Sequence, residues 1–118
     1  MNKEPNQINF LEFPGGSVEA VAKIKAFYSA VFGWGFKDWG DDYIDTSDSG
    51  LASGFNADPE HCPIKPLAVI YASDLVTVRA AVLAAGGVLT KETFEFPGGR
   101  RFHFTDPAGN ELAVWSDK

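Results

Sequence analysis

The order of segments that the sequence predicts is repeated once along the chain. An apolar strand-like segment, a helical segment and three short strands follow one another in residues 8–56, and the same order returns in residues 67–116. A repeat of this length corresponds to a supersecondary unit that must bury its apolar face against a neighbour. We therefore predict one α+β domain over residues 1–118, in which the Pro-rich connector 57–66 joins module 8–56 to module 67–116.

The first module begins with INFLEFP, residues 8–14, which alternates as a strand does and stops at a Pro-Gly-Gly loop. We expect Ser17 to be the helix N-cap and Gly33 to end the helix. Strands are predicted around 34–39, 41–46 and 50–56, separated by Gly and Asp turns. The apolar stripe of the helix recurs at a spacing of three to four and consists of Val18, Val21, Ile24, Phe27 or Tyr28, and Val31.

The second module begins with the apolar strand LAVIYA, residues 67–72. Ser73 or Asp74 caps the following helix, and Gly86-Gly87 end it at the usual C-terminal position. The remaining strands are predicted around 88–96, 100–105 and 110–115.

The composition and charge of the chain argue against some classes of partner and indicate its cellular compartment. A formal net charge of -6, with no basic cluster beyond Arg100-Arg101, argues against nucleic acid. No apolar run approaches the length of a membrane span, and residues 1–7 lack the apolar core of a signal peptide. The single cysteine, Cys62, cannot form an internal disulfide, so we expect a reducing, cytoplasmic location.

The turn Asp106-Pro107-Ala108-Gly109 predicts the register of the last hairpin. Its residues suit a type I turn closed by a left-handed glycine, which places Asp106 across from Asn110. The predicted cross-strand pairs are Thr105 with Glu111, Phe104 with Leu112, His103 with Ala113, Phe102 with Val114, and Arg101 with Trp115.

This register separates two faces. The apolar face, which should pack under the helices, holds Phe102, Phe104, Leu112 and Val114. The opposite face holds Arg101, His103, Thr105, Glu111, Ala113 and Trp115. It is either the lining of a pocket, which combines aromatic walls with a few polar groups, or a solvated sheet face with one chance aromatic.

Four segments, together with the doubled plan, resemble the glyoxalase, bleomycin resistance protein and extradiol dioxygenase superfamily, also called vicinal oxygen chelate (VOC) proteins. They are FYSAVFGW (27–34), GLASGF (50–55), AAGG (84–87) and FTDPAGNELAVW (104–115). The resemblance implies two βαβββ modules that form curved mixed sheets around a ligand cavity, with the helices outside. It also implies a homodimer, whose cavity lies within one chain or between two.

In the metal-dependent branch of that family, ligands lie on the first and last strands of each module, and the metal polarises vicinal substrate oxygens. The resemblance places Phe10, Leu67 and Ala113 at three of these positions, and none of these side chains offers a lone pair. We therefore predict no metal and no cofactor. Glu111 and His103 could supply two donors, which are too few for a site of their own.

The predicted ligand-binding residues combine aromatic and polar side chains. Phe10, Tyr71 and Trp115 would enclose a ligand, and Arg101, His103 and Glu12 would orient it, next to Leu67 and Ala113. Tyr71 is either a hydrogen-bond donor to the ligand or a rim residue. Catalytic residues are not identified: His103 is a candidate acid or base, and Glu12 is one if it is buried, although an ordinary carboxylate near the strand end is the favoured interpretation.

Five aspartates crowd the segment DWGDDYIDTSDSG, but their spacing does not match a calcium loop. We expect a solvated hairpin that carries Asp38, Asp41, Asp42, Asp45 and Asp48.

The favoured hypothesis is a metal-independent protein that binds a small, partly aromatic or cationic organic molecule. The alternatives are a glyoxalase-type lyase or isomerase, or a dioxygenase-like enzyme, with a non-standard site. In a third hypothesis the cavity is vestigial and the dimer surface carries the function.

Overall fold

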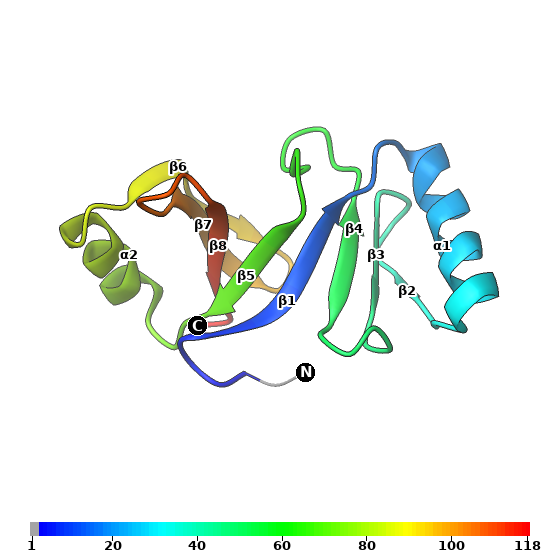
Figure 1. The fold of residues 1–118 in the computed structure, drawn as a ribbon, viewed down its shortest axis with the longest axis horizontal. Coiled ribbons are helices and arrows are strands. Elements are labelled where there is room, and N and C mark those ends of the chain that lie inside the picture. The colour runs from blue at the N-terminus through cyan, green and yellow to red at the C-terminus, as the bar shows by residue number, and fades with distance from the viewer. Residues whose placement is uncertain (1–2) are drawn as a thin grey trace. The chain divides into compact units, whose positions relative to one another are not determined.

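The computed structural model describes residues 3–118 and divides the chain into two compact units. The first unit is Phe10–Leu67, and the second combines Ala68–Lys118 with the N-terminal segment up to Asn9. Each unit contains one helix and a mixed sheet, so the predicted α+β class and the two βαβββ modules are confirmed (Figure 1). Neither helix within residues 3–118 has the length and apolarity that a membrane crossing requires.

The sheet of the first unit has the strand order β2-β3-β4-β1. Its elements are β1 (Gln7–Pro14, which enters this unit at Phe10), α1 (Val18–Phe32), β2 (Lys37–Asp38), β3 (Tyr43–Thr46) and β4 (Ser53–Asn56). β1 and β4 are parallel, whereas the other neighbouring strands are antiparallel. The three predicted strands after the helix are present but shorter, because the Gly and Asp turns between them take up more of the chain.

Local sequence signals set the ends of α1. The Ser17 hydroxyl accepts a hydrogen bond from the backbone N–H of Ala20 at 3.1 Å, and Gly33 ends the helix in the left-handed conformation with φ 74°. The buried face of the helix meets Ile44 and Phe55 through Val21. The core of this unit therefore lies between α1 and one face of its sheet.

The sheet of the second unit has the strand order β5-β8-β7-β6, with β5 and β8 parallel. Its elements are β5 (Leu67–Tyr71), α2 (Leu75–Ala84), β6 (Val88–Phe96), β7 (Gly99–Thr105) and β8 (Glu111–Ser116). Asp74 caps α2 by accepting from the backbone N–H of Thr77 at 3.2 Å. At the other end the N–H of Gly87 bonds to the carbonyl of Val82 at 2.9 Å, and Gly86 has φ 98°, so the predicted glycine pair does end the helix.

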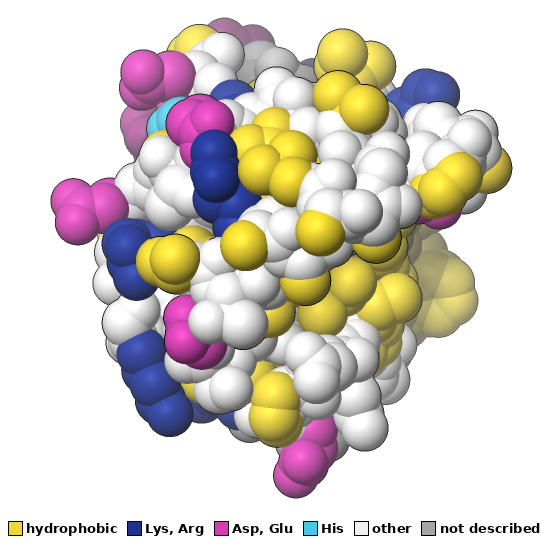
Figure 2. Space-filling view, turned by 90° about the vertical axis from the view of Figure 1, so that its left-hand side faces the viewer, with side chains coloured by type: hydrophobic (Ala, Val, Ile, Leu, Met, Phe, Trp, Pro, Cys, Tyr) yellow, Lys and Arg dark blue, Asp and Glu magenta, His cyan; other side chains and the backbone are white. Residues whose placement is uncertain are grey.

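The predicted register of the last hairpin is confirmed at all five pairs from Thr105 with Glu111 to Arg101 with Trp115. The backbone N–H of Asp106 donates to the carbonyl of Asn110 at 2.9 Å, and Gly109 has φ 85°. The apolar face packs as expected, because Phe102 is 0% exposed and belongs to a core with Leu75 of α2. Figure 2, viewed from the side of α2, shows hydrophobic side chains reaching the surface beside polar ones.

Candidate functional site

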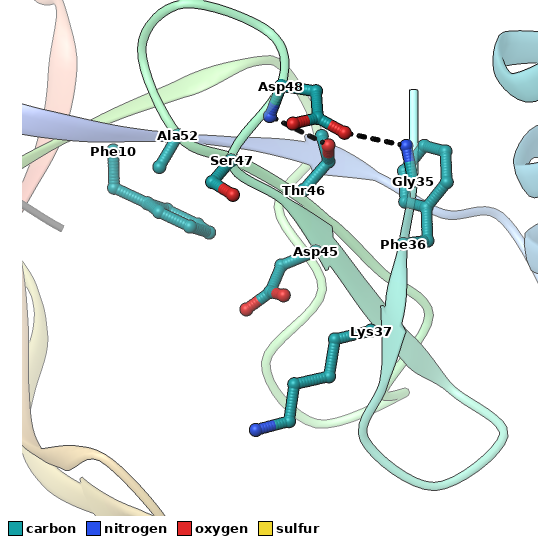
Figure 3. A pocket seen from close by; sticks show the side chains of 9 residues that line it. All are labelled: Phe10, Gly35, Phe36, Lys37, Asp45, Thr46, Ser47, Asp48 and Ala52. Carbon is teal, nitrogen blue, oxygen red and sulfur yellow. Dashed lines mark hydrogen bonds between the residues drawn. The ribbon is translucent and has the colours of Figure 1, made fainter. Parts of the chain in front are cut away.

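The first unit contains a pocket of about 390 Å³. Its lining comes from β1, β2, β3 and the loops beside them, and consists of Phe10, Gly35, Phe36, Lys37, Asp45, Thr46, Ser47, Asp48 and Ala52. Figure 3 shows the Phe10 ring, the Asp45 carboxylate and the Lys37 side chain extending to the same side of β3. Of the residues that the sequence singled out for ligand binding, Phe10 lines this pocket.

The polar wall of the pocket comes from the hairpin of β2 and β3. Lys37 and Asp45 are cross-strand neighbours. The indole Nε1–H of Trp39 donates to Asp45 Oδ2 at 3.0 Å, while the Lys37 ammonium lies 4.1 Å from the centre of the Trp39 ring. Burial raises the pKa of Asp45, against smaller opposing effects of the Trp39 hydrogen bond and the Lys37 charge. The expectation of a wholly solvated hairpin is wrong for Asp45, because its strand turns this side chain inward.

Backbone and side-chain hydrogen bonds fix the loops at the far end of the pocket. Asp48 Oδ2 accepts from the N–H of Gly35 at 2.8 Å, and the N–H of Asp48 donates to Thr46 Oγ1 at 3.0 Å (Figure 3). The bond from Gly35 uses the Asp48 carboxylate as a structural group of the loop. Asp45 is therefore the lining carboxylate best placed to meet a ligand.

Glu12 lies on the same face of β1 as Phe10 and is fully buried, with 0% exposure. The Tyr43 hydroxyl donates to Glu12 Oε1 at 3.0 Å, and Asn56 Nδ2 donates to Oε2 at 3.4 Å. The favoured interpretation of an ordinary carboxylate near the strand end is therefore wrong. Gly54 makes the arrangement possible, because a Cβ there would lie 2.5 Å from the Tyr43 hydroxyl and 2.7 Å from Phe10 Cζ.

The second unit brings five of the predicted residues to one face, namely Tyr71, Arg101, His103, Ala113 and Trp115. Arg101 and His103 are 7% and 5% exposed, so this face is not the solvated one that the sequence left open. The Arg101 guanidinium lies 5.4 Å from the ring centre of Phe94 and 5.9 Å from that of Phe96. Cation–π contacts of this kind hold a buried guanidinium in place.

Tyr71 uses its hydroxyl within the protein. It donates to Asp117 Oδ1 at 2.7 Å, and its ring packs edge-on against Trp115 at 5.1 Å. Lys3 binds the other carboxylate oxygen of Asp117 at 2.7 Å. The hydrogen bonds from Lys3 and Tyr71 lower the pKa of Asp117 to about 2, and the bond to Asp117 raises the pKa of the Tyr71 hydroxyl.

These contacts predict an acid-sensitive contribution to stability. Because the pKa of Asp117 is about 2 in the folded chain and about 3.9 for a free aspartate, its contribution is present above pH 4 and declines as the pH falls toward 2. The Asp117→Asn variant should therefore lose stability relative to the wild type at pH 6 and approach it near pH 2. Urea unfolding at a series of pH values measures this difference, and a difference that stays constant with pH would contradict the assignment.

His103 and Glu111 form a further polar contact of this face. His103 Nδ1 lies 3.7 Å from Glu111 Oε2, which accepts a hydrogen bond of 2.6 Å from the Thr90 hydroxyl. The described residues 3–118 contain no group of three or more His, Cys, Asp or Glu side chains that could hold a metal ion. Phe10, Leu67 and Ala113, at the positions where the family resemblance implies ligands, are buried apolar groups. The residues present therefore do not fit the metal of the metal-dependent relatives.

Several residues that surround the predicted ones were not predicted from the sequence. In the first unit these are Lys37, Trp39, Tyr43 and Asp45; in the second they are Phe94 and Phe96. The alternation of YIDT places Tyr43 and Asp45 on one face, opposite the buried Ile44. That signal was available in the sequence, but the density of Asp around it favoured a solvated turn.

Comparisons with known proteins agree on the fold. A family model described as "Glyoxalase/Bleomycin resistance protein/Dioxygenase superfamily" matches residues 16–114. No curated protein sequence matches the chain.

Three solved structures that have the same fold are described as different kinds of protein. A methylmalonyl-CoA epimerase from Mycobacterium tuberculosis is 11% identical, with a TM-score of 0.68 over 98% of this chain and 91% of its own. A protein described as an NAD-dependent benzaldehyde dehydrogenase from Legionella pneumophila is 13% identical, with a TM-score of 0.75 over 92% and 98%. The Mn(II)-bound glyoxalase from Novosphingobium aromaticivorans is 21% identical, with a TM-score of 0.65 over 96% of this chain but only 39% of the glyoxalase. At these identities the likeness concerns the fold alone.

Proposed function

Since the chain belongs to the glyoxalase/bleomycin resistance protein/dioxygenase superfamily, we propose that it is a metal-independent member that binds a small organic molecule. The single observation that carries the proposal is the position of Phe10. The family resemblance puts a metal-ligating histidine at this place in the first strand, and here an aromatic ring lines a pocket of about 390 Å³. This volume is within the range of small-molecule sites, which combine apolar walls with a few polar groups.

Binding would follow from the two kinds of wall in this pocket. Phe10, Phe36 and Ala52 offer apolar surface, while Lys37 and Asp45 offer charge. Removing the apolar part of a ligand from water supplies affinity, and the charged groups select among ligands. A protein that sequesters its ligand needs no chemical step beyond this.

Metal analysis and ligand binding together test the proposal. Protein purified without chelator should contain far less than one equivalent of nickel, zinc, manganese or iron. Tryptophan fluorescence across a panel of small aromatic metabolites and antibiotics should identify compounds that bind. Phe10→Leu should weaken their binding by about two- to tenfold, as expected when an aromatic contact worth about 0.5–1.5 kcal/mol is lost. Phe27→Leu, which changes a 57% exposed ring on α1, is the matched control. Stoichiometric metal, or no response to any compound, would contradict the proposal.

A second candidate function, an isomerase that moves a proton without a metal, is favoured by the His103 contact. Thr90 orients Glu111, Glu111 lies beside Nδ1 of the buried His103, and such a carboxylate stabilises an imidazolium. His103 would take a proton from a carbon next to a carbonyl and return a proton to the resulting enolate, at the same carbon or at a neighbouring one. Incorporation of deuterium from heavy water into a panel of oxo acids and thioesters, abolished in His103→Asn, would favour this function over simple binding.

A further inference from the structure

We propose that the pocket of the first unit takes an organic cation, a protonated amine attached to a small aromatic group, with Asp45 as its anionic anchor and Phe10 as its flat wall. This inference rests on the proposed function, because it names the class of molecule that the same pocket would bind. It is drawn from the pocket residues Phe10, Lys37, Asp45, Ser47 and Asp48.

The hydrogen bonds of Asp45 leave room for a ligand donor. Among the described residues 3–118, Trp39 is the one that donates to this carboxylate, at Oδ2. A carboxylate has two oxygens and about four acceptor positions, so Oδ1 can accept from an ammonium group. In Figure 3 the Asp45 carboxylate extends from β3 to the side on which the Phe10 ring and the Lys37 ammonium also lie. A charge-assisted hydrogen bond to such a group is stronger than one between neutral partners.

The charges around Asp45 favour a cation over an anion. Burial raises the pKa of Asp45 although the Trp39 hydrogen bond and the Lys37 charge oppose it, so its negative charge is only partly compensated. Lys37 is the basic residue of the lining, and its ammonium lies over the Trp39 ring at 4.1 Å. The other lining carboxylate, Asp48, adds a second negative charge and accepts from Gly35. A bound cation would balance the negative charge of Asp45 and Asp48 that Lys37 balances only in part.

The apolar wall fits the remainder of such a ligand. The Phe10 ring lies on the same side of β3 as the Asp45 carboxylate (Figure 3), so an aromatic amine could place its ring on Phe10 and its ammonium at Asp45. Phe10 also attracts a cation at its ring face. The Ser47 side chain belongs to the same lining and can accept a second hydrogen bond from the ammonium.

Three probes of similar size test the inference: benzylamine, which is protonated at neutral pH, its neutral isostere benzyl alcohol, and the anion benzoate. Binding is measured from the NMR resonance of the Trp39 indole N–H, which donates a hydrogen bond to Asp45 of the pocket lining. Wild-type protein should bind benzylamine at least about tenfold more tightly than benzyl alcohol and should bind benzoate least. Asp45→Asn should bind benzylamine and benzyl alcohol equally, whereas Asp41→Asn, which removes the same charge from an exposed position on the same hairpin, should keep the preference.

A second variant keeps the test independent of how well Asp45→Asn folds. Lys37→Met should tighten benzylamine binding severalfold, since it removes the competing cation beside Asp45. Equal binding of benzylamine and benzyl alcohol by the wild type would overturn the proposal that the pocket takes a cation. It would leave the proposal of small-molecule binding intact. No shift of the Trp39 resonance with any of the three probes, together with no response in the wider panel, would overturn both.

Discussion

Phe102→Ala should be the most destabilising side-chain truncation in the second unit. Phe102 is 0% exposed and packs in one core with Leu75 and Val114. Removing a buried phenyl ring costs the transfer free energy of its atoms and leaves a cavity, for a total of about 3–5 kcal/mol in the free energy of unfolding. Urea denaturation followed by circular dichroism measures this change. Because the total stability of a small domain is about 5–15 kcal/mol, Phe102→Leu, with a smaller expected loss, should be measured beside it.

Phe27→Ala is the matched control, because it removes the same ring from a position on α1 that is 57% exposed. Phe27 retains one edge-on contact, with Tyr28 at 5.1 Å. Its loss should cost clearly less than that of Phe102, because the pair contributes about 0.5–1.5 kcal/mol and most of the ring is already in contact with water. If the two truncations cost the same, the face of β7 that carries Phe102 would not be the core face.

The core position of Phe102 was predictable because the turn after Thr105 is short and chemically specific. Asp106 and Gly109 allow one register, and the register assigns each residue of both strands to a face. The helix ends were predictable for a similar reason, since Ser17, Asp74 and Gly86 act on backbone groups within four residues of themselves. Such signals are contained in a few consecutive residues, so one sequence is enough to read them.

The candidate site was only partly predictable, because its contacts join residues that are distant in the sequence. Glu12 is buried by Tyr43 and Asn56, which are 31 and 44 residues away. Nothing near Glu12 in the chain indicates that Gly54 leaves space beside it. Alternation within β1 assigned Glu12 to the face of Phe10, but burial depends on which strands lie alongside.

The environment of Asp45 was also not predictable from the sequence, for a different reason. Composition favoured a solvated hairpin, since five aspartates lie within a short segment. The pocket depends on one of them alternating inward while Trp39 reaches it from the neighbouring strand end. The average character of a segment therefore does not predict the environment of a single side chain in it.

Gly99→Ala should also cause a large loss in the free energy of unfolding, because backbone strain and steric overlap would both occur at this residue. Gly99 has φ 151°, a conformation that is open essentially to glycine alone. A Cβ at this position would also overlap the backbone carbonyl oxygen of Ser116 and lie 2.9 Å from its carbon. Backbone strain of about 1–3 kcal/mol and overpacking of about 1–3 kcal/mol give an expected loss of about 2–6 kcal/mol in the free energy of unfolding.

Gly109→Ala separates these two costs. Gly109 also has a positive φ, 85°, but a Cβ there would meet nothing within 4 Å. It should therefore cost only the strain of a left-handed residue, about 1–2 kcal/mol. The excess in Gly99→Ala would measure the contact with Ser116, and equal losses would contradict it. Since Asp117 follows Ser116 and holds the Tyr71 hydroxyl, Gly99→Ala should also weaken that bond, which the pH dependence of unfolding would reveal as a smaller loss of stability between pH 4 and 2.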